Sequence, residues 1–468
     1  MSHELDWTLA QASQALAEGR SSAQALTEAS LRRAQLVQAR TNAFLKITAD
    51  SAQSEARLSD EAPRRHVLQG IPMAHKDCFA RAGERMTVGM RAERQPDRLT
   101  ATVLARLQAC AVVDIGRLHL SEAIAGPSGN NVQFGDCRNA WNLDYISGGS
   151  SSGSAVAVAS GSVFAALGTD TGGSVRIPAS LNGLFGLRPS FGRVSRYGAF
   201  PRSQSMDVIG PLARTAQDCA LMLQVIAGPD AMDSATAGLA VPDYVGCLEG
   251  AAQGLRLGIL QTDEALEANV EQGFEQFLGV ASRRFGVMPE RRFDDWPLLY
   301  ALGDAYAKTE PAQVHAAAMS ADPGSYAKAV YTRTEPGLHL PAVRYIQAEQ
   351  LRPMMLRRFV EQAFCDVDVL ILPTLPLAAP RIHDMNMEKG GSVHSLVPRL
   401  TCLTRPFGYL GLPVMSMPMG LDAQGLPMGV QLVGKPYAEA RLLSLAHHLS
   451  LDLGWSFRPS MLEAAKGT

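Results

Sequence analysis

Two amphipathic helices are predicted at the start of the chain from the spacing of its apolar residues. Leucines and alanines recur at helical spacing over residues 5–16, and Gly19 then breaks the pattern. Ser21 or Ser22 can cap a second helix that continues to about residue 40, because a serine hydroxyl accepts a hydrogen bond from a free N–H group at a helix start. The N-terminal region is therefore predicted to be helical.

Helices and strands alternate through the middle of the chain. Residues 102–110 have the pattern of a helix, and residues 112–116 form a short apolar run that ends at a glycine. Small apolar residues at 155–159 predict a buried helix. Its N-terminus would face the preceding loop and present unpaired N–H groups to it. This alternation predicts an α/β architecture.

Three apolar strands and a helix are predicted in the last quarter of the chain. Residues 368–373, 412–418 and 428–434 have the composition of buried strands. The turn-forming residues 422–427 would join the last two of these strands as neighbours, and residues 438–449 have a helical pattern.

The segment from about residue 230 to 345 is less regular than its neighbours. Pro311, Pro323 and Pro336 interrupt its helical pattern. We expect this segment to lie at the periphery and to shape substrate access. A chain of 468 residues could form about three domains, but no linker, charge block or repeat marks a boundary, so one large domain is equally open.

Composition narrows the class of protein. Hydrophobic residues make up 46% of the chain and charged residues 19%, which suits a globular protein with a buried core. The net charge of −2 gives no electrostatic reason to expect nucleic acid or an anionic membrane as partner. Seven scattered cysteines without a C-x-x-C pair predict neither a disulfide framework nor a zinc site. Neither a secretory signal nor a membrane-spanning run is found, so we expect a cytoplasmic protein.

Two glycine-serine loops carry the main candidate chemistry. Residues 148–154 read Gly-Gly-Ser-Ser-Ser-Gly-Ser, and residues 168–176 read Gly-Thr-Asp-Thr-Gly-Gly-Ser-Val-Arg. Glycines let the backbone approach a ligand closely, and a serine hydroxyl can attack a carbonyl carbon once a base removes its proton. Together, these loops predict an acyl-transfer site that contains Ser150 and Ser174.

A third segment, residues 70–77, supplies a candidate base. Lys76 follows the apolar residues 71–74, and burial lowers the pKa of a lysine from its usual value of about 10.4 into a useful range. Asp77 would oppose this shift if its carboxylate turned toward the lysine. Because side chains alternate along a strand, we expect both Asp77 and His75 to point away from Lys76.

These segments resemble the motifs of a known family. Residues 148–178 are similar, almost residue by residue, to the signature of the amidase signature family, and residues 70–77 resemble its lysine motif. Residues 191–198 and 205–212 resemble the segment that follows the nucleophile, and residues 434–436 resemble the end of its C-terminal strand pair. The similarity covers most of the chain and is weakest between about residues 230 and 340.

The resemblance implies a fold and a domain plan. The expected fold is the α/β amidase signature fold, a large mixed β-sheet of about ten strands with helices on both faces. The chain is then a single amidase domain over residues 1–468. Its signature core is expected at about 66–215 and its variable substrate-access region at about 230–345.

The resemblance also implies a Ser-Ser-Lys triad. Ser174 is the expected nucleophile, Ser150 the bridging serine after a cis peptide bond with Gly149, and Lys76 the base. Backbone N–H groups would surround the carbonyl oxygen as it becomes an oxyanion. The expected oxyanion-hole residues are Thr171, Gly172, Gly173 and Ser174, and the expected supporting residues are Asp170 and Arg176.

Position 177 is informative about the substrate. Malonamidase-like members of the family carry an arginine there, and the amidotransferase subunit that works on charged tRNA carries a glutamine, whereas this chain has Ile177. We therefore expect an apolar pocket wall and a neutral or apolar acyl group. The candidate pocket residues are Gly126, Ser128, Ile177, Tyr331 and Arg333.

The implied activity is hydrolysis of the C–N bond of a linear amide through an acyl-enzyme on Ser174. The chemistry requires neither a metal ion nor an organic cofactor. The expected partner is a small-molecule amide, and the resemblance also admits a homodimer, because many members of the family form one. The sequence does not disclose which amide is cleaved.

Three alternatives remain open. The chain could be a glutaminase-type amidotransferase subunit that supplies ammonia to a partner, although Ile177 counts against this, or an inactive amidase-like binding protein. Residues 149–153 also fit the G-x-S-x-G nucleophile elbow, with Ser151 as nucleophile and His447 or His448 as base. Both histidines, however, lie in an amphipathic helical pattern and are expected to be surface or packing residues.

Overall fold

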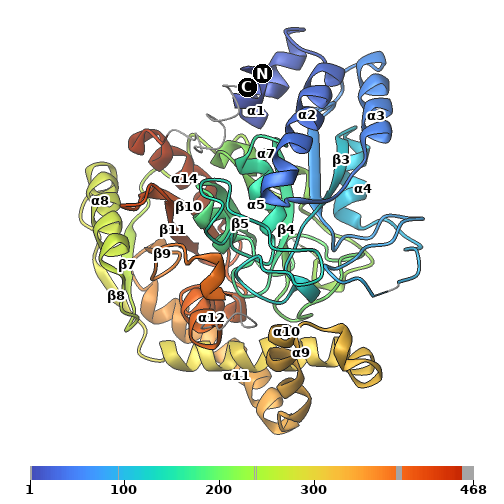
Figure 1. The fold of residues 1–468 in the computed structure, drawn as a ribbon. Coiled ribbons are helices and arrows are strands. Elements are labelled where there is room, and N and C mark those ends of the chain that lie inside the picture. Colours follow the sequence, from blue (N-terminus) through green and yellow to red (C-terminus); the bar gives the residue numbers. More distant parts are fainter. Residues whose placement is uncertain (1–2, 93, 237, 239, 386–392, 456–468) are drawn as a thin grey trace.

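A mixed β-sheet of eight strands forms the centre of the protein (Figure 1). The structure is a computed structural model that describes residues 3–92, 94–236, 238, 240–385 and 393–455. Its strands are β4 (Ala165–Asp170), β5 (Phe185–Arg188), β6 (Val208–Ala213), β7 (Leu257–Gln261), β8 (Glu290–Arg292), β9 (Val369–Pro373), β10 (Val414–Leu421) and β11 (Pro427–Gly434). They are ordered β4-β6-β5-β10-β11-β9-β7-β8. Neighbours are antiparallel from β4 to β9, whereas β7 runs parallel to both β9 and β8.

A second, three-stranded sheet lies beside β4. It consists of β1 (Phe44–Ile47), β2 (Pro72–Lys76) and β3 (Val113–Leu118) in the order β1-β3-β2. The strands thus number eleven in the described residues and form two sheets, where the sequence predicted about ten in one. The two sheets approach each other here: the N–H of Phe164, just before β4, donates to the carbonyl of Pro72 at 3.3 Å, whereas the N–H of Leu167 in β4 donates to Nδ1 of His75 at 3.1 Å.

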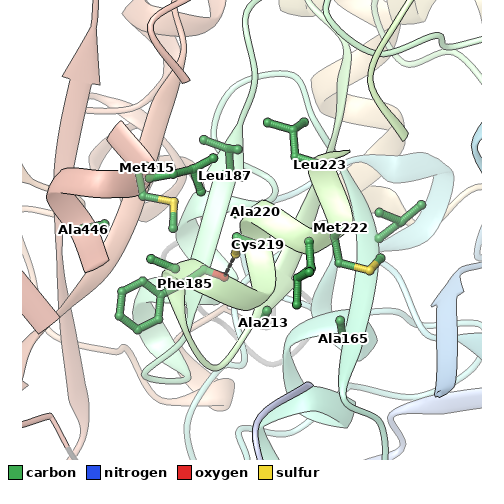
Figure 2. Packing of buried hydrophobic residues seen from close by; sticks show 14 of the residues in the cluster. Ala165, Phe185, Leu187, Ala213, Cys219, Ala220, Met222, Leu223, Met415 and Ala446 are labelled. Carbon is green, nitrogen blue, oxygen red and sulfur yellow. Dashed lines mark hydrogen bonds between the residues drawn. The ribbon is translucent and has the colours of Figure 1, made fainter. Parts of the chain in front are cut away.

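Helices cover both faces of the large sheet, as predicted. They include α7 (Ala216–Ile226) and α14 (Glu439–Leu453) on one face, and α5 (Ser152–Ala159) and α6 (Arg176–Leu181) on the other. The alternation along β11 shows this division: Val430 and Leu432 belong to the core that includes α14, whereas Gln431 between them reaches Arg176 of α6 at 2.8 Å. Figure 2 shows Phe185 and Met415 of the sheet packed against Cys219 and Ala220 of α7.

The N-terminal helices follow the sequence pattern closely. They are α1 (Leu9–Ala17), α2 (Ala23–Thr41), α3 (Ala49–Glu61) and α4 (Thr102–Ala109). Ser22 caps α2, since its hydroxyl accepts the N–H of Ala25 at 3.1 Å. The first helix begins later than predicted, at Leu9, because Thr8 forms a capping box with Gln11.

The segment predicted to be irregular is largely helical. It contains α8 (Ala268–Phe285), α9 (Trp296–Ala321) and α10 (Lys328–Thr334), and is followed by α11 (Ala342–Ala363). The expected break at Pro311 is wrong, because this proline lies inside α9. The preceding residue, Glu310, is buried and bonds Ser203, Ser205 and Tyr345, so tertiary contacts hold the helix together there.

The other two expected breaks are confirmed. Short 3-10 turns occur at Pro323–Ser325 and Glu335–His339, on either side of α10. Two further short helices, α12 (Val393–Thr401) and α13 (Arg405–Leu410), precede β10. None of the described helices is long and apolar enough to cross a membrane.

Candidate active site

The first glycine-serine loop leads directly into α5. The peptide bond between Gly149 and Ser150 is cis. Gly148 has a φ of 77°, and a Cβ atom at this position would lie 2.7 Å from Cα of Pro178. A residue with a side chain would therefore clash with α6, which explains the glycine. The predicted cis bond and the predicted helix after the loop are both confirmed.

Lys76, at the end of β2, is fully buried and points into this loop. Its Nζ lies 2.8 Å from Oγ of Ser150, 3.2 Å from Oγ of Ser151 and 2.7 Å from Oγ1 of Thr169. An ammonium group has three donors and no acceptor, whereas a neutral amine has a lone pair. The neutral form can therefore accept a proton from one of these hydroxyls.

The environment of Lys76 favours that neutral form. Burial lowers its pKa to about 8, and the nearby carboxylates of Asp207 and Asp170 oppose the shift. A pKa near 8 suits a general base that works around neutral pH.

The two residues that flank Lys76 point away from it, as predicted. His75 accepts the N–H of Leu167, and burial lowers the pKa of its imidazole to about 4. The carboxylate of Asp77 bonds Nη1 of Arg117 at 3.1 Å and the N–H of Thr87 at 2.8 Å. Neither side chain is a hydrogen-bond partner of the lysine in the described part of the protein.

The second loop is built around the buried carboxylate of Asp170. Arg176 and Arg188 each form an ion pair with it, at 2.9 Å and 3.0 Å, and it also accepts the N–H groups of Gly173 and Val175. Burial alone would raise the pKa of this carboxyl, but the two guanidinium groups outweigh burial and hold the pKa well below its usual range. Asp170 and Arg176, the two predicted supporting residues, are therefore in direct contact, with Arg188 as an additional partner of the carboxylate.

The loop holds Ser174 half-buried at the wall of a cavity. Among the described residues, the N–H groups of Thr171, Gly172 and Ser174 donate no hydrogen bond, so they are available to a ligand. The N–H of Gly173 is already engaged by Asp170 at 2.9 Å. Its expected place in the oxyanion hole is therefore not supported by the geometry.

The cavity in front of Ser174 has a volume of about 370 Å³, at the small end of the range for ligand sites. The elements α9, α10, α12 and α13 contribute to its walls, and α9 and α10 belong to the segment at about 230–345 that was predicted to shape substrate access. Of the predicted pocket residues, those that line it are Gly126, Ile177 and Arg333.

The other two predicted pocket residues lie outside this cavity. Tyr331 packs in a separate apolar cluster with Met90 and Val330. Ser128 lines a much smaller cavity behind Arg333, of about 40 Å³. Helical geometry explains the first error, because Tyr331 and Arg333 are two positions apart in α10 and face different directions.

The nucleophile-elbow alternative finds no support in the structure. Oγ of Ser151 bonds Lys76 and the carbonyl oxygen of Thr169 rather than a histidine. His447 and His448 both lie in α14, where each contacts Glu249. They are peripheral residues, as expected.

Several residues that surround the site were not found from the sequence. Thr169 is the second residue of the 168–176 segment and still belongs to β4, and its alternation with Asp170 along that strand could have revealed that it faces Lys76. Arg202 and Arg405 also line the cavity, from segments far apart in the chain. No local pattern predicts that these two arginines meet.

Comparisons with known proteins agree with this geometry. The family model described as Amidase matches residues 25–443. The A subunit of glutamyl-tRNA(Gln) amidotransferase from Roseiflexus castenholzii (strain DSM 13941 / HLO8) is 36% identical over 487 residues, covering 96% of each chain. The corresponding protein from Pseudomonas aeruginosa (strain PAO1) is 33% identical, covering 98% of this chain and 99% of the relative.

Solved structures extend the similarity to the fold. One, described as an unexpected vestigial protein complex that reveals the evolutionary origins of an s-triazine catabolic enzyme, has a TM-score of 0.90 and 30% identity, covering 97% of this chain and all of the other. The peptide amidase PAM, bound to the competitive inhibitor chymostatin, has a TM-score of 0.81 and 27% identity, covering 97% and 98%.

These relatives correct one expectation from the sequence. A small-molecule amide, with at most a second copy of the chain, was the expected set of partners. The relatives are by name subunits of an amidotransferase, and one of the solved structures is described as a protein complex, so that expectation is wrong. The family model, the identity over almost the whole length and the shared fold establish that this chain belongs to the amidase signature family.

Proposed function

We propose that this chain cleaves the C–N bond of an amide through an acyl intermediate on Ser174. The observation that carries the proposal is the contact between Nζ of Lys76 and Oγ of Ser150, at 2.8 Å, behind a cavity whose wall contains Ser174. In this assignment Lys76 is the base, Ser150 relays the proton and Ser174 is the nucleophile.

The reaction is then a two-step acyl transfer. Neutral Lys76 accepts a proton through Ser150 while Oγ of Ser174 bonds to the amide carbon. The same relay returns the proton to the leaving nitrogen, the C–N bond breaks, and ammonia or an amine departs. Water, deprotonated by the relay, next attacks the acyl-enzyme and releases a carboxylic acid and free Ser174.

Backbone donors would stabilise the negative charge that develops on the carbonyl oxygen. The N–H groups of Thr171, Gly172 and Ser174 are unoccupied within the described residues and lie in one turn beside the nucleophile. Donors of this kind are fixed before the reaction begins, and loss of a single one commonly costs roughly 100- to 1,000-fold in rate.

We further propose that the chain is the amide-cleaving component of an assembly with another protein. The identity with the A subunits of glutamyl-tRNA(Gln) amidotransferases over nearly the full length supports this role. In an amidotransferase, ammonia from the cleaved amide passes to a partner, whereas in a hydrolase ammonia is released to solvent. Ile177 supports hydrolysis, because the tRNA-dependent amidotransferase subunits of this family carry a glutamine at the corresponding position.

Ammonia release separates these two functions. The purified chain is assayed with glutamine and with a panel of other linear amides, alone and with the remaining glutamyl-tRNA(Gln) amidotransferase subunits of the same cell. A hydrolase releases ammonia alone from an amide other than glutamine, and Ser174→Ala abolishes the release. A component of an amidotransferase cleaves glutamine only when its partner proteins are added. If no combination releases ammonia, the catalytic proposal is refuted and the chain is a binding protein.

A further inference from the structure

The cavity in front of Ser174 carries an excess of positive charge. Among its described lining residues, the cationic side chains are Arg202, Lys308, Arg333 and Arg405, and the only carboxylate is that of Asp304. An excess of one charge in a small, partly enclosed site is costly unless a ligand of opposite charge neutralises it.

The single carboxylate is already committed to two of the four cations. Asp304 pairs with Arg405 and, at 2.6 Å, with Nζ of Lys308. The guanidinium of Arg405 also bonds the hydroxyl of Tyr300 at 3.0 Å and stacks on its ring. Arg202 and Arg333 form no ion pair within the described part of the chain, although the nearby charge of Glu122 partly offsets that of Arg333, so these two arginines carry the excess charge that remains.

Both unpaired arginines retain donors that could bind an anion. Nη1 of Arg202 is buried and has no hydrogen-bond partner among the described residues. Among the described residues, the hydrogen-bond acceptors of the Arg333 guanidinium are two backbone carbonyls, those of Ala329 at 2.7 Å and Ala125 at 3.3 Å. A buried guanidinium donor without a partner is unfavourable in the free protein, and a carboxylate would satisfy it.

The two guanidinium groups also repel each other. Burial, followed by the charges of Arg333 and Arg405, lowers the pKa of Arg202 to about 9, with Asp207 opposing the shift. Asp207 does not form an ion pair with Arg202, because its carboxylate is occupied by Thr171 Oγ1 at 2.5 Å and by the N–H groups of Arg202 and Ser203. The repulsion therefore remains in the ligand-free protein.

We propose that the substrate is an amide whose acyl part carries a second carboxylate, and that Arg202 and Arg333 bind that carboxylate while Ser174 attacks the amide. This assignment rests on the proposed amide cleavage. The hydrolysis consumes one water and converts the mono-amide of a dicarboxylic acid into the dicarboxylate and ammonia. Ile177, which is buried in the cavity wall, contacts the carbon chain between the two ends.

The same charges disfavour a substrate that also carries an ammonium group. An α-amino acid amide such as glutamine would bring a positive charge into a cavity with two unpaired arginines, and Asp304 already has two cationic partners. This assignment replaces the expectation, drawn from Ile177 alone, that the acyl group is neutral. Ile177 still forms an apolar wall of the cavity, but the positive charge of the opposite wall favours a substrate whose far end carries a carboxylate.

Charge-matched substrate pairs test the proposal. The mono-amides of malonic, succinic and glutaric acid are each compared with the neutral diamide of the same acid, which differs in charge and hardly in size. We expect kcat/KM to favour the best mono-amide over its diamide by roughly ten- to hundred-fold, the range of a hydrogen-bonded charge pair. Arg202→Met and Arg333→Met should each lower kcat/KM for the mono-amide far more than for the diamide, mainly through KM, and so remove most of this preference.

A control variant and a binding measurement complete the design. Arg344→Met removes the same charge from the exposed surface of α11 and should leave the preference intact. Calorimetric titration of Ser174→Ala with succinate and with succinamide measures recognition without catalysis, and only succinate should bind. Equal use of mono-amide and diamide, or equal losses on both substrates in the arginine variants, overturns the carboxylate assignment and leaves amide cleavage standing. Binding of succinate without cleavage of any amide supports the carboxylate site and refutes the proposed function instead.

Discussion

The pH dependence of the reaction follows from the position of Lys76. Its ammonium form is saturated by three hydroxyl acceptors and cannot act as a base, so only the neutral form starts the cycle. Because burial lowers the pKa of Lys76 to about 8, we expect kcat/KM to rise with pH and to reach half of its plateau near pH 8.

The size of the effect can be worked out from this value. With a pKa of about 8, roughly a tenth of the molecules carry neutral Lys76 at pH 7 and about nine tenths do at pH 9. The rate should therefore increase about ten-fold over these two units. A solvent-exposed lysine, with a pKa of about 10.4, would still be almost entirely charged at pH 9.

The assay is the kcat/KM for ammonia release between pH 6 and 10, together with the rate of fluorophosphonate labelling, which needs no deacylation step. Both profiles should show the same rise near pH 8, since both depend on the free enzyme. Lys76→Ala should lose roughly 100- to 10,000-fold and also the pH dependence. A rate that is flat between pH 6 and 9, or that falls as pH rises, would refute Lys76 as the base.

Two further substitutions probe the surroundings of the triad. Thr169→Val removes a hydrogen-bond acceptor 2.7 Å from Nζ of Lys76 and so destabilises the ammonium form. The rise of kcat/KM should therefore move to lower pH. An unchanged pH profile would show that Thr169 does not influence the pKa of Lys76. Asp170→Asn leaves Arg176 and Arg188 buried without a carboxylate and should reduce the free energy of unfolding by about 3–5 kcal/mol in urea denaturation. The control variant Asp368→Asn removes a half-exposed ion pair with Arg256 and should reduce the free energy of unfolding by less than about 1 kcal/mol. Equal losses in the two variants would contradict the structural role of Asp170.

The segments that carry Lys76, Ser150 and Ser174 could be recognised in the sequence because each is a short local motif, and their assignment to one triad came from the resemblance to the amidase signature family. Glycines stand where the backbone needs positive φ or close contact, as at Gly148, and strand alternation separates Lys76 from His75. These features depend on neighbouring residues and so leave a pattern in short segments. The same is true of Ser22, whose hydroxyl caps the helix that it begins.

The features that could not be predicted depend on contacts between distant segments. Pro311 should end a helix, since proline lacks the N–H that would bond the carbonyl of Ala307. Glu310 nevertheless holds α9 in place through partners about a hundred residues earlier, Ser203 and Ser205. The charge of the cavity is likewise set by arginines from three separate segments, so Ile177 alone indicated only one wall of the pocket.

The most direct test of the account is to identify the residue that becomes acylated. The protein is treated with a fluorophosphonate at pH 9, digested, and the modified residue is located by mass spectrometry, with Ser174→Ala and Ser151→Ala treated in parallel. The account predicts modification of Ser174, its loss in Ser174→Ala and its persistence in Ser151→Ala. Modification of Ser151, or an unmodified Ser174 in folded protein, would contradict it.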